Sequence, residues 1–315
     1  MTRRLSVEPR DHVPSTIELV RFTEDRAPTR EELIAGAAGA TTLLTLVSDP
    51  IDGAVLDAIG TVRHVAQVAV GYDNIDVDAC RERGVLVTHT PDVLTDATAD
   101  LTWTLILAVA RRVREGEALV RSGRFVGWSP TMLLGMELRG RTLGIFGFGR
   151  IGRAVAERAR GFGMRVIACS RSPFESAEVT RVGFDTLLED SDVLSIHAPL
   201  DPSTRGRFGA AELARMRPGS ILVNTARGPL IDEAAIAGAL ERGPLLGVGL
   251  DVYEREPIVH PSLLGRDDVV LLPHLGSATE AARRRMATTA LTDAVRVAEG
   301  QAPLHPIPSQ PNTRY

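Results

Sequence analysis

Short apolar runs alternate with helix-like stretches along most of the chain. In its N-terminal part the apolar runs predict strands at residues 16–20, 42–47, 64–70 and 85–88. The stretches between them predict helices from Thr29 to near Gly36 or Gly39, at 52–59 and at 77–83, and a capping-box pattern, Thr29-Arg30-Glu31-Glu32, opens the first. Because buried strands that alternate with helices form parallel sheets, this pattern predicts an α/β unit.

A long helical stretch at residues 94–115 leads to a second alternating pattern. Its leucines and small apolar residues recur at helical spacing, which indicates a core or interdomain helix. A glycine-rich connection at 116–140 follows, and then apolar runs predict strands at 142–146, 165–169, 193–196, 221–224, 246–250 and 269–272. A helix at 279–299 and a proline-rich tail at 303–315 end the pattern. Six parallel strands with helices between them predict a doubly wound, Rossmann-type sheet.

Composition fits a globular protein of two domains. The chain has 315 residues, of which 44% are hydrophobic and 24% charged. Its net charge is −4, so we expect neither nucleic acid nor a membrane as a partner. No lysine occurs in the sequence, which excludes Schiff-base chemistry and a Walker lysine.

Two observations bear on the compartment. Cys80 and Cys169 are the only cysteines, and so few cysteines indicate a reducing environment rather than a disulfide scaffold. Residues 1–20 lack the apolar segment of a signal peptide, and the apolar stretch at 101–110 is too short to span a bilayer. We therefore predict a cytoplasmic protein, and we predict no metal site.

A glycine-rich turn between a strand and a helix predicts a dinucleotide site. The turn follows the apolar run 142–146 and reads Gly147-Phe148-Gly149-Arg150-Ile151-Gly152. We expect Gly147 to form the tight turn, Gly149 to let the backbone approach a pyrophosphate, and Gly152 to allow close packing of helix on strand. The helix N-terminus would then face the anion.

Candidate chemistry follows three later strands. Arg227 comes after the predicted strand 221–224, at the edge where open α/β sheets bind ligands, and an arginine there can hold a carboxylate by two parallel hydrogen bonds. Glu256 follows the next strand and His274 the one after it. A carboxylate beside an imidazole favours the imidazolium, so His274 could donate a proton near neutral pH.

Six phrases together resemble the D-isomer-specific 2-hydroxyacid dehydrogenase family, in matching order from about residue 16 to 299. The phrases are Val70-Gly71-Tyr72-Asp73-Asn74-Ile75-Asp76, Leu94-Thr95-Asp96-Ala97-Thr98-Ala99-Asp100, the glycine turn, Asn224-Thr225-Ala226-Arg227-Gly228, Asp251-Val252-Tyr253-Glu254-Arg255-Glu256-Pro257 and Pro273-His274-Leu275-Gly276-Ser277-Ala278-Thr279. Within the family the chain most resembles the glyoxylate/hydroxypyruvate reductases, through Gly71-Tyr72-Asp73, Trp128-Ser129-Pro130 and His274-Leu275-Gly276-Ser277.

The resemblance implies two domains and an activity. Residues 1–90 with 282–315 would form a smaller, flavodoxin-like substrate domain, and residues 91–281 the dinucleotide-binding domain. The implied activity is reduction of a small 2-oxo acid to the D-2-hydroxy acid by hydride transfer from NAD(P)H. The implied assembly is a homodimer built mainly through the cofactor domains. Trp128 would then either reach the partner's site or serve as an interface tryptophan.

The resemblance also implies residue roles. His274 would be the proton donor, Glu256 its partner, and Arg227 the clamp on the substrate carboxylate. Backbone amides around Val70, Gly71 and Tyr72 would complete the carboxylate site. The implied cofactor contacts are Gly147, Gly149, Arg150, Ile151, Gly152, Ser170, Arg171, Ser172, Thr225, Ala226, Asp251 and Gly276. Of these, Asp251 would contact the nicotinamide carboxamide. His89, His197 and His260 are interpreted as structural or peripheral, although His89 stands where asparagine is commoner in the family.

The end of the second strand of this domain bears on the choice of cofactor. Enzymes that use NAD carry an acidic residue there for the adenosine ribose, and this chain has Ser170-Arg171-Ser172 instead. Without the carboxylate a 2′-phosphate meets no like charge, and two hydroxyls with a guanidinium can bind it. We predict NADPH as the preferred cofactor, with NADH possible.

Alternatives stay open at this point. A D-3-phosphoglycerate dehydrogenase-like enzyme shares these motifs, and so does a nucleotide-sensing corepressor of the same fold that does no catalysis. Family members also usually begin with a full strand and helix before the strand at 16–20, whereas only Leu5-Ser6-Val7 precedes it here. The substrate domain is therefore expected either to lack its first helix or to begin with an irregular arm.

Overall fold

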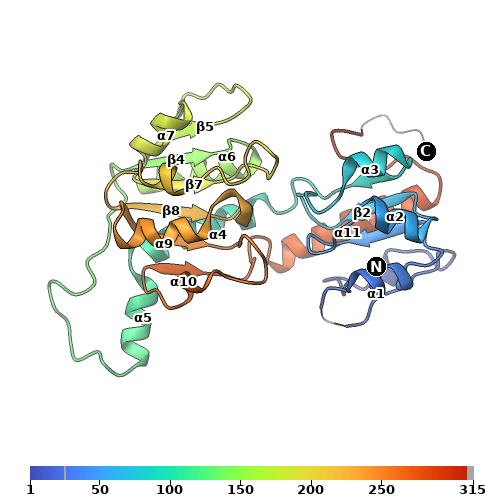
Figure 1. Cartoon of the computed structure of the whole chain (residues 1–315), viewed down its shortest axis with the longest axis horizontal. Helices are drawn as coiled ribbons and strands as arrows, with labels where there is room; N and C mark the ends of the chain where they lie inside the picture. The colour runs from blue at the N-terminus through green and yellow to red at the C-terminus, as the bar shows by residue number, and fades with distance from the viewer. Residues whose placement is uncertain (25, 311–315) are drawn as a thin grey trace. The chain divides into compact units, whose positions relative to one another are not determined.

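A computed structural model describes residues 1–24 and 26–310. Two compact units divide the chain: Met1–Leu94 with Ala278–Tyr315, and Thr95–Ser277. Figure 1 shows a parallel sheet with helices in each of them. We call the first of them the small unit and the second the large unit.

The large unit is a doubly wound parallel sheet, which confirms the predicted fold class. In the described residues its strand order is β10-β9-β8-β7-β4-β5-β6. The chain starts at β4, fills one side of the sheet and then returns to fill the other, so the order reverses between β4 and β7. The strands are β4 (Thr142–Phe146), β5 (Arg165–Cys169), β6 (Val179–Arg181), β7 (Val193–Ile196), β8 (Ser220–Asn224), β9 (Leu245–Leu250) and β10 (Val269–Leu271).

The predicted count of six strands is wrong by one, since the sheet also contains β6. This strand has three residues, of which only Val179 is buried, and it lies at the sheet edge. An edge strand with so little apolar surface leaves no run of hydrophobic residues to detect.

Helices cover both faces of the large sheet. Leu143, Ile145 and Val166 pack on one face with α4 (Thr95–Ala110) and α6 (Arg150–Ala159). The other face packs against α7 (Phe184–Asp190), α8 (Ala210–Leu213) and α9 (Glu233–Glu241). The remaining short elements are α5 (Val113–Arg121), α10 (Pro261–Leu264), η2 (Arg160–Phe162) and η3 (Gly228–Leu230). Alternate side chains of each strand thus pack into two hydrophobic cores, one on each face of the sheet, as is typical of parallel sheets covered by helices on both faces.

The predicted single helix at 94–115 is two helices. The chain breaks at Arg112, which has φ 51°, and α5 then runs on into the segment predicted as a connection. The amide of Met136 donates to the carbonyl of Ala110 at 2.8 Å, so a distant loop caps the end of α4. No glycine or proline marks the break, which is why the sequence does not reveal it.

The small unit has a parallel sheet whose described strands follow the order β1-β2-β3. They are β1 (Thr42–Thr45), β2 (His64–Gln67) and β3 (Leu86–Thr88), with helices α1 (Arg30–Gly36), α2 (Gly53–Ile59), α3 (Val77–Glu82) and α11 (Glu280–Ala298). The predicted capping box is confirmed, because Thr29 and Glu32 each accept from the other's amide. α11 buries Met286, Ala290 and Leu291 in the core that Leu44 and Ala66 also join.

The predicted strand at 16–20 is wrong, and the chain begins with an irregular arm. In the part of the arm that the structure describes, one 3₁₀ turn, η1 (Pro9–Asp11), interrupts it. The amide of Thr2 donates to Leu44 at 3.1 Å, and the N-terminal ammonium donates to Val20 at 3.1 Å. The Thr2 amide therefore occupies a hydrogen-bonding position at the free edge of β1. Residues 16–20 would need such positions to pair with β1 as a strand.

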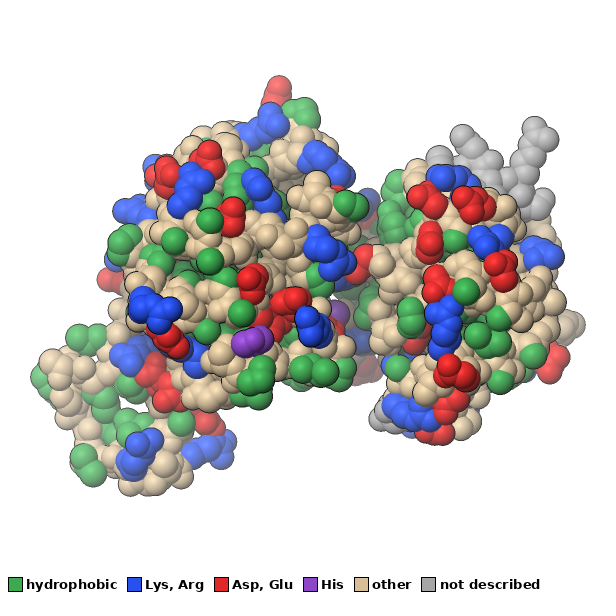
Figure 2. Space-filling view, viewed as in Figure 1, with side chains coloured by type: hydrophobic (Ala, Val, Ile, Leu, Met, Phe, Trp, Pro, Cys, Tyr) green, Lys and Arg blue, Asp and Glu red, His purple; other side chains and the backbone are tan. Residues whose placement is uncertain are grey.

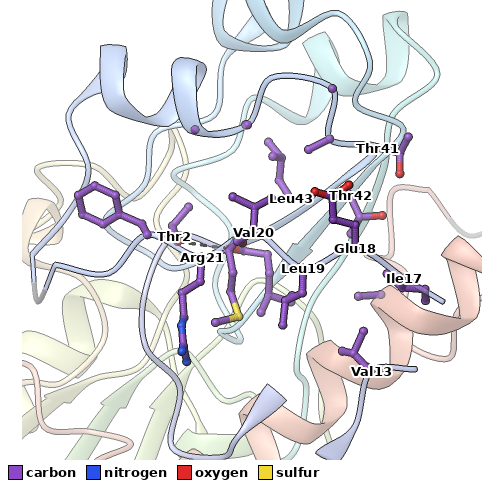
Figure 3. A pocket seen from close by; sticks show the side chains of 18 of the residues that line it. Thr2, Val13, Ile17, Glu18, Leu19, Val20, Arg21, Thr41, Thr42 and Leu43 are labelled. Atoms are coloured by element: carbon purple, nitrogen blue, oxygen red, sulfur yellow. Dashed lines mark hydrogen bonds between the residues drawn. The ribbon is translucent and has the colours of Figure 1, made fainter. Parts of the chain in front are cut away.

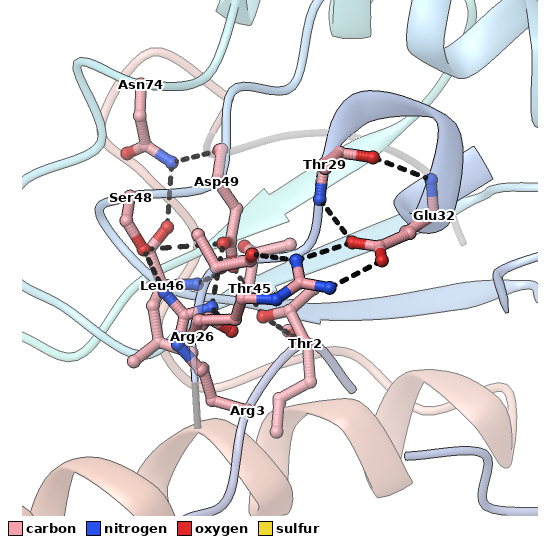
Figure 4. Close-up of polar contacts among 12 residues, drawn as sticks. Thr2, Arg3, Arg26, Thr29, Glu32, Thr45, Leu46, Ser48, Asp49 and Asn74 are labelled. Atoms are coloured by element: carbon pink, nitrogen blue, oxygen red, sulfur yellow. Dashed lines mark hydrogen bonds and ion pairs between the residues drawn. The ribbon is translucent and has the colours of Figure 1, made fainter. Parts of the chain in front are cut away.

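Side chains hold the arm to the small unit (Figure 4). Arg26 binds both oxygens of Glu32, at 2.6 and 2.7 Å, and Arg3 donates to Ser48 at 2.9 Å. Beneath the arm lies a hollow of about 490 Å³, lined mainly by apolar side chains such as Val13, Leu43 and Leu291 (Figure 3).

The other edge of the small sheet carries the C-terminal segment. Ile307 donates to Val87 at 3.1 Å, and the side chain of Gln310 accepts from the Val87 amide at 2.9 Å. His305 binds the buried Asp293 of α11 at 2.9 Å. The last part of the predicted tail, 311–315, lies outside the described residues. Among the helices described, none has the length and apolar character to cross a membrane.

Candidate active site

The turn after β4 requires glycine at two of its three motif positions. Gly147 has φ +96°, and a Cβ there would lie 2.4 Å from the amide nitrogen of Ala198, just after β7. At Gly152 a Cβ would lie 2.3 Å from the carbonyl oxygen of Gly147. The first turn of α6 can therefore approach the end of β4 only because both side chains are absent.

Gly149 differs, because a Cβ there would meet no described atom within 4 Å. It is the N-cap of α6, and Arg150 and Ile151 take the first two helical positions. The position of that Cβ, beside the first amides of α6 and the positive end of its dipole, is thus open. A cofactor pyrophosphate fits this space, since helix N-termini bind anionic groups through backbone amides.

The end of β5 lies beside this turn, because the amide of Gly147 donates to Cys169 at 2.9 Å. Ser170 follows partly buried, and Arg171 and Ser172 are exposed. Arg171 forms an ion pair with Asp201 at 3.2 Å while 82% of its side chain stays exposed. Hydrogen bonds from Ser203 lower the pKa of Asp201, so this carboxylate is charged. The predicted phosphate-binding segment thus contains a cation, Arg171, that is already paired with an anion, Asp201.

Asn224 organises the end of β8. Its carbonyl accepts the amide of Asp251 at 3.0 Å, and its side chain accepts from Ala226 at 3.0 Å and donates to Arg227 at 2.8 Å. A Cβ at Gly228 would lie 1.8 Å from the carbonyl carbon of Tyr253. The loop that carries Arg227 therefore lies directly against the loop after β9.

Asp251 joins the ends of β9 and β10. Its side chain is fully buried, and its two oxygens accept the amides of Leu275 and Gly276 at 2.6 and 2.7 Å. Burial raises the pKa of Asp251, and these two amides oppose the rise. The amide of His274 also donates to the Asp251 carbonyl at 2.9 Å. His274 itself has φ 57°, an unusual backbone state for a residue other than glycine.

His274 and Glu256, which the sequence predicts as an acid/base pair, are in direct contact. His274 Nδ1 lies 2.9 Å from Glu256 Oε2, and 34% of each side chain is exposed. The other carboxylate oxygen accepts the Tyr253 amide at 3.1 Å. Burial raises the pKa of Glu256, but the contact with His274, the Tyr253 amide and the charge of Arg227 outweigh it and lower the pKa below its ordinary value. An ionised Glu256 fixes the ring so that Nε2 is left for a substrate.

In the small unit the predicted substrate residues form the loop after β2. The carbonyl of Val70 accepts from His89 Nδ1 at 2.9 Å, and Gln67 donates to the carbonyl of Gly71 at 3.3 Å. The rings of His89 and Tyr72 meet edge to face at 5.6 Å. These contacts give His89 a structural role, that of bracing the loop.

The other histidines set aside in the sequence are also structural. Burial lowers the pKa of His197 to about 3, so it is neutral, and its Nε2 lies 2.8 Å from Ser195. His260 caps α10 through its side chain.

Comparison with known proteins identifies the family. The model of the D-isomer specific 2-hydroxyacid dehydrogenase NAD-binding domain matches residues 103–276. A glyoxylate reductase of Thermococcus litoralis is 46% identical over 294 residues, which cover 91% of this chain and 89% of the relative. The chain belongs to the D-isomer-specific 2-hydroxyacid dehydrogenase family.

Solved structures agree with this assignment. The TT0316 protein from Thermus thermophilus has a TM-score of 0.91 and 43% identity, with 97% of this chain and 98% of that chain covered. An NADPH-dependent glyoxylate/hydroxypyruvate reductase from Sinorhizobium meliloti, in complex with NADP and malonate, has a TM-score of 0.85 and 34% identity, with 94% and 92% covered. The prediction of an NAD(P)-dependent oxidoreductase of this family, with a nicotinamide cofactor, is confirmed.

The structure of this dehydrogenase also reveals residues to which the sequence assigns no role. Thr98 of α4 donates to the carbonyl of Gly276 at 3.0 Å, and Thr102 lies 2.9 Å from the hydroxyl of Thr225. One turn of a buried helix thus supports two of the predicted cofactor-lining loops. Their spacing of four residues is a detectable signal, but threonines at that spacing are common in ordinary helices.

Two glycine substitutions separate cofactor binding from folding. We expect Gly149→Ala to leave the melting temperature unchanged, because its methyl group enters open space, but to raise the Kd for NADPH and NADH at least about 10-fold, because that space is where the pyrophosphate would sit. Gly152→Ala should instead destabilise the fold by about 1–3 kcal/mol through overpacking. Calorimetric titration and thermal unfolding measure both effects. Wild-type affinity in Gly149→Ala would contradict this placement of the pyrophosphate.

Proposed function

We propose that this dehydrogenase reduces a small 2-oxo acid of the glyoxylate or hydroxypyruvate class to the D-2-hydroxy acid. The observation that carries the proposal is the 2.9 Å contact between His274 and Glu256, together with the close approach of the Arg227 loop to the loop that carries Glu256. The names of the relatives support the substrate class. An acid, its partner and an arginine at the carboxyl edge of one sheet match the needs of a carboxylate-bearing carbonyl substrate.

The reaction converts a 2-oxo acid, NAD(P)H and a proton into a 2-hydroxy acid and NAD(P)⁺. A bound reduced nicotinamide supplies the hydride that adds to C2. His274 Nε2 gives its proton to the carbonyl oxygen as negative charge develops there, while ionised Glu256 stabilises the imidazolium through Nδ1. The neutral imidazole that remains regains a proton from solvent. The reaction therefore needs one general acid to supply the proton, and His274 fits that role.

Arg227 is proposed to bind the substrate carboxylate and polarise its carbonyl, since a guanidinium can serve two oxygens at once. Amides around Val70, Gly71 and Tyr72 are proposed to complete this carboxylate site. Asp251 is first a positioning residue, because both of its oxygens hold amides of the His274 loop. Its contact with a nicotinamide carboxamide stays a prediction, as does a cytoplasmic location.

Removal of the proton donor tests the function. The wild type should oxidise NAD(P)H with glyoxylate and hydroxypyruvate, and His274→Ala should lower kcat by about 10²–10⁴ while the cofactor still binds. His12→Ala, an exposed histidine, is the matched control. The assay is loss of reduced-nicotinamide absorbance. Tight cofactor binding with no turnover of either acid would favour the corepressor alternative. Faster turnover of 3-phosphohydroxypyruvate than of these acids would favour the phosphoglycerate dehydrogenase-like alternative.

NADPH is the proposed preferred cofactor, and Arg171 is the residue on which the preference depends. The ion pair with Asp201 does not prevent this, because exposed pairs contribute only about 0–1 kcal/mol and the Arg171 side chain is free to turn. A 2′-phosphate carries more charge than one carboxylate and offers three oxygens. Asp201 would then compete for Arg171, which makes it a second determinant of the preference.

Two substitutions of opposite sign test this preference. Arg171→Ala should raise the KM for NADPH about 10-fold or more and leave that for NADH nearly unchanged, because only NADPH loses a charge-assisted hydrogen bond. Asp201→Asn should lower the KM for NADPH, since Arg171 loses its competing partner. Arg160→Ala, another exposed arginine, is the control. Equal effects of Arg171→Ala on both cofactors would mean that the arginine only stacks on adenine.

We also propose a homodimer that forms through α5 and the segment after it. Large apolar side chains are exposed there, with Val126 98% and Trp128 81% exposed. Figure 2 shows hydrophobic side chains gathered over this part of the large unit. Exposed apolar surface of this kind is typical of an interface between subunits.

The mass in solution tests the dimer. The wild type should sediment as a dimer, and Val126→Asp combined with Trp128→Ser should shift it toward the monomer, because charge and lost apolar area weaken the contact. Leu264→Asp, which alters an exposed leucine of α10, should leave the mass unchanged. A dimer unaffected by the double substitution would place the interface elsewhere.

A further inference from the structure

Glu233 is a buried carboxylate that the proposed reaction does not use. It occupies the first position of α9, directly after the N-cap Asp232, and its exposed fraction is 3%. A buried carboxylate is costly unless hydrogen bonds satisfy its oxygens. Its partners therefore indicate why the position holds an acid.

Both partners of Glu233 are amides of the loop that carries Glu256. Oε1 accepts the amide of Glu254 at 2.5 Å, and Oε2 accepts the amide of His260 at 2.8 Å. One side chain thus ties together two points of the loop, one on each side of Glu256. Between them Ile258 donates to the carbonyl of Arg255 at 2.9 Å, so the intervening residues form a tight turn.

The turn has little other support near its tip. Residues 254–258 are exposed, and the Glu256 side chain rests on the Tyr253 amide and on His274. At the base of the loop, Tyr253 packs against Gly228 and its hydroxyl donates to Leu272 at 2.8 Å. Those contacts fix where the loop leaves the sheet. Beyond that point, Glu233 holds the loop backbone through the amides of Glu254 and His260.

We propose that Glu233 is a positioning residue that holds Glu256 in hydrogen-bonding register with His274. The inference rests on the proposed function, because the pair matters only if His274 donates the proton. Glu233 touches neither of the two side chains and acts through the loop backbone.

The chemistry of the contact explains the residue type. Two amide donors converge on the side chain, so both of its terminal atoms must accept. Glutamine has the same size but offers only one acceptor atom. Its NH₂ group would face a backbone N–H, and two donors cannot form a hydrogen bond with each other. Aspartate keeps both acceptors but is one methylene shorter. Glu233→Gln therefore breaks the arrangement at nearly constant volume, and Glu233→Asp tests rescue.

The charged groups around His274 define what the variant should change. Glu256 contacts the ring, Asp251 lies behind the loop, and Arg227 acts on Glu256. Asp251 and Arg227 are held by other bonds, so Glu233→Gln should disturb Glu256 alone. A displaced Glu256 stabilises the imidazolium less, and the proton is then lost at lower pH.

The experiment measures kcat/KM against pH for reduction of glyoxylate, together with the NMR titration of the His274 ring, assigned from the spectrum of His274→Ala. Glu233→Gln should lower kcat/KM about 10-fold and move the alkaline limb and the His274 titration to lower pH. Glu233→Asp should recover part of both. The Kd of NADPH should not change, since the glycine turn after β4 is remote from α9 in the chain and does not share these bonds. Glu241→Gln, at the other end of α9, is the control.

A double-mutant cycle identifies the route of the effect. If Glu233 acts through Glu256, Glu233→Gln should have no further effect on either pH measurement in a Glu256→Gln background. An unchanged His274 titration in Glu233→Gln, or an equal loss of activity in both backgrounds, would overturn the proposal and leave Glu233 a stabilising residue only. If the wild type reduces neither acid, the proposed function fails, and the NMR titration still decides the positioning role.

Discussion

The carboxylate of Asp251 is the contact on which the arrangement of the site most depends. A fully buried acid tolerates burial only when its oxygens are satisfied, and here the amides of Leu275 and Gly276 satisfy them. Those bonds turn the chain sharply after β10, and His274 takes a left-handed backbone state as a consequence. The cost of such a state, about 1–3 kcal/mol, is met by the bonds on either side of it. The ring of His274 is thereby directed by buried hydrogen bonds rather than by its own preferences.

Close backbone contact gives the rest of the site its precision. Gly147 lies against the end of β7, Gly152 against Gly147, and Gly228 against Tyr253, each at a separation that excludes a side chain. In each case two backbone segments at the carboxyl edge of the sheet approach each other without side chains between them. Such contacts cannot slide, because backbone atoms have no rotamers to adjust. The edge of the sheet therefore presents its functional groups from a rigid base.

Sequence reasoning identified the fold, and it proposed the candidate site residues, because both have strong local patterns. A buried parallel strand is a continuous apolar run, and each functional segment follows directly after one, so Arg227, Glu256 and His274 could be assigned to a common edge. What it missed lacks such a pattern. β6 buries one residue, the break at Arg112 depends on a cap from Met136, and the arm at 16–20 depends on which segment pairs with β1. Glu233 looks like an ordinary first-turn glutamate, since acids favour helix N-termini, and only the fold brings the amides of Glu254 and His260 to it.

Each unit fixes the geometry of its own candidate residues. In the large unit, bonds of Asp251 hold the His274 loop and the Tyr253 amide binds Glu256. In the small unit, His89 and Gln67 hold the loop at Val70. His89 makes two such contacts, since one ring nitrogen holds the Val70 carbonyl and the ring meets Tyr72 edge to face. Neither set of bonds includes residues of the other unit, so the geometry of each loop is set within its own unit.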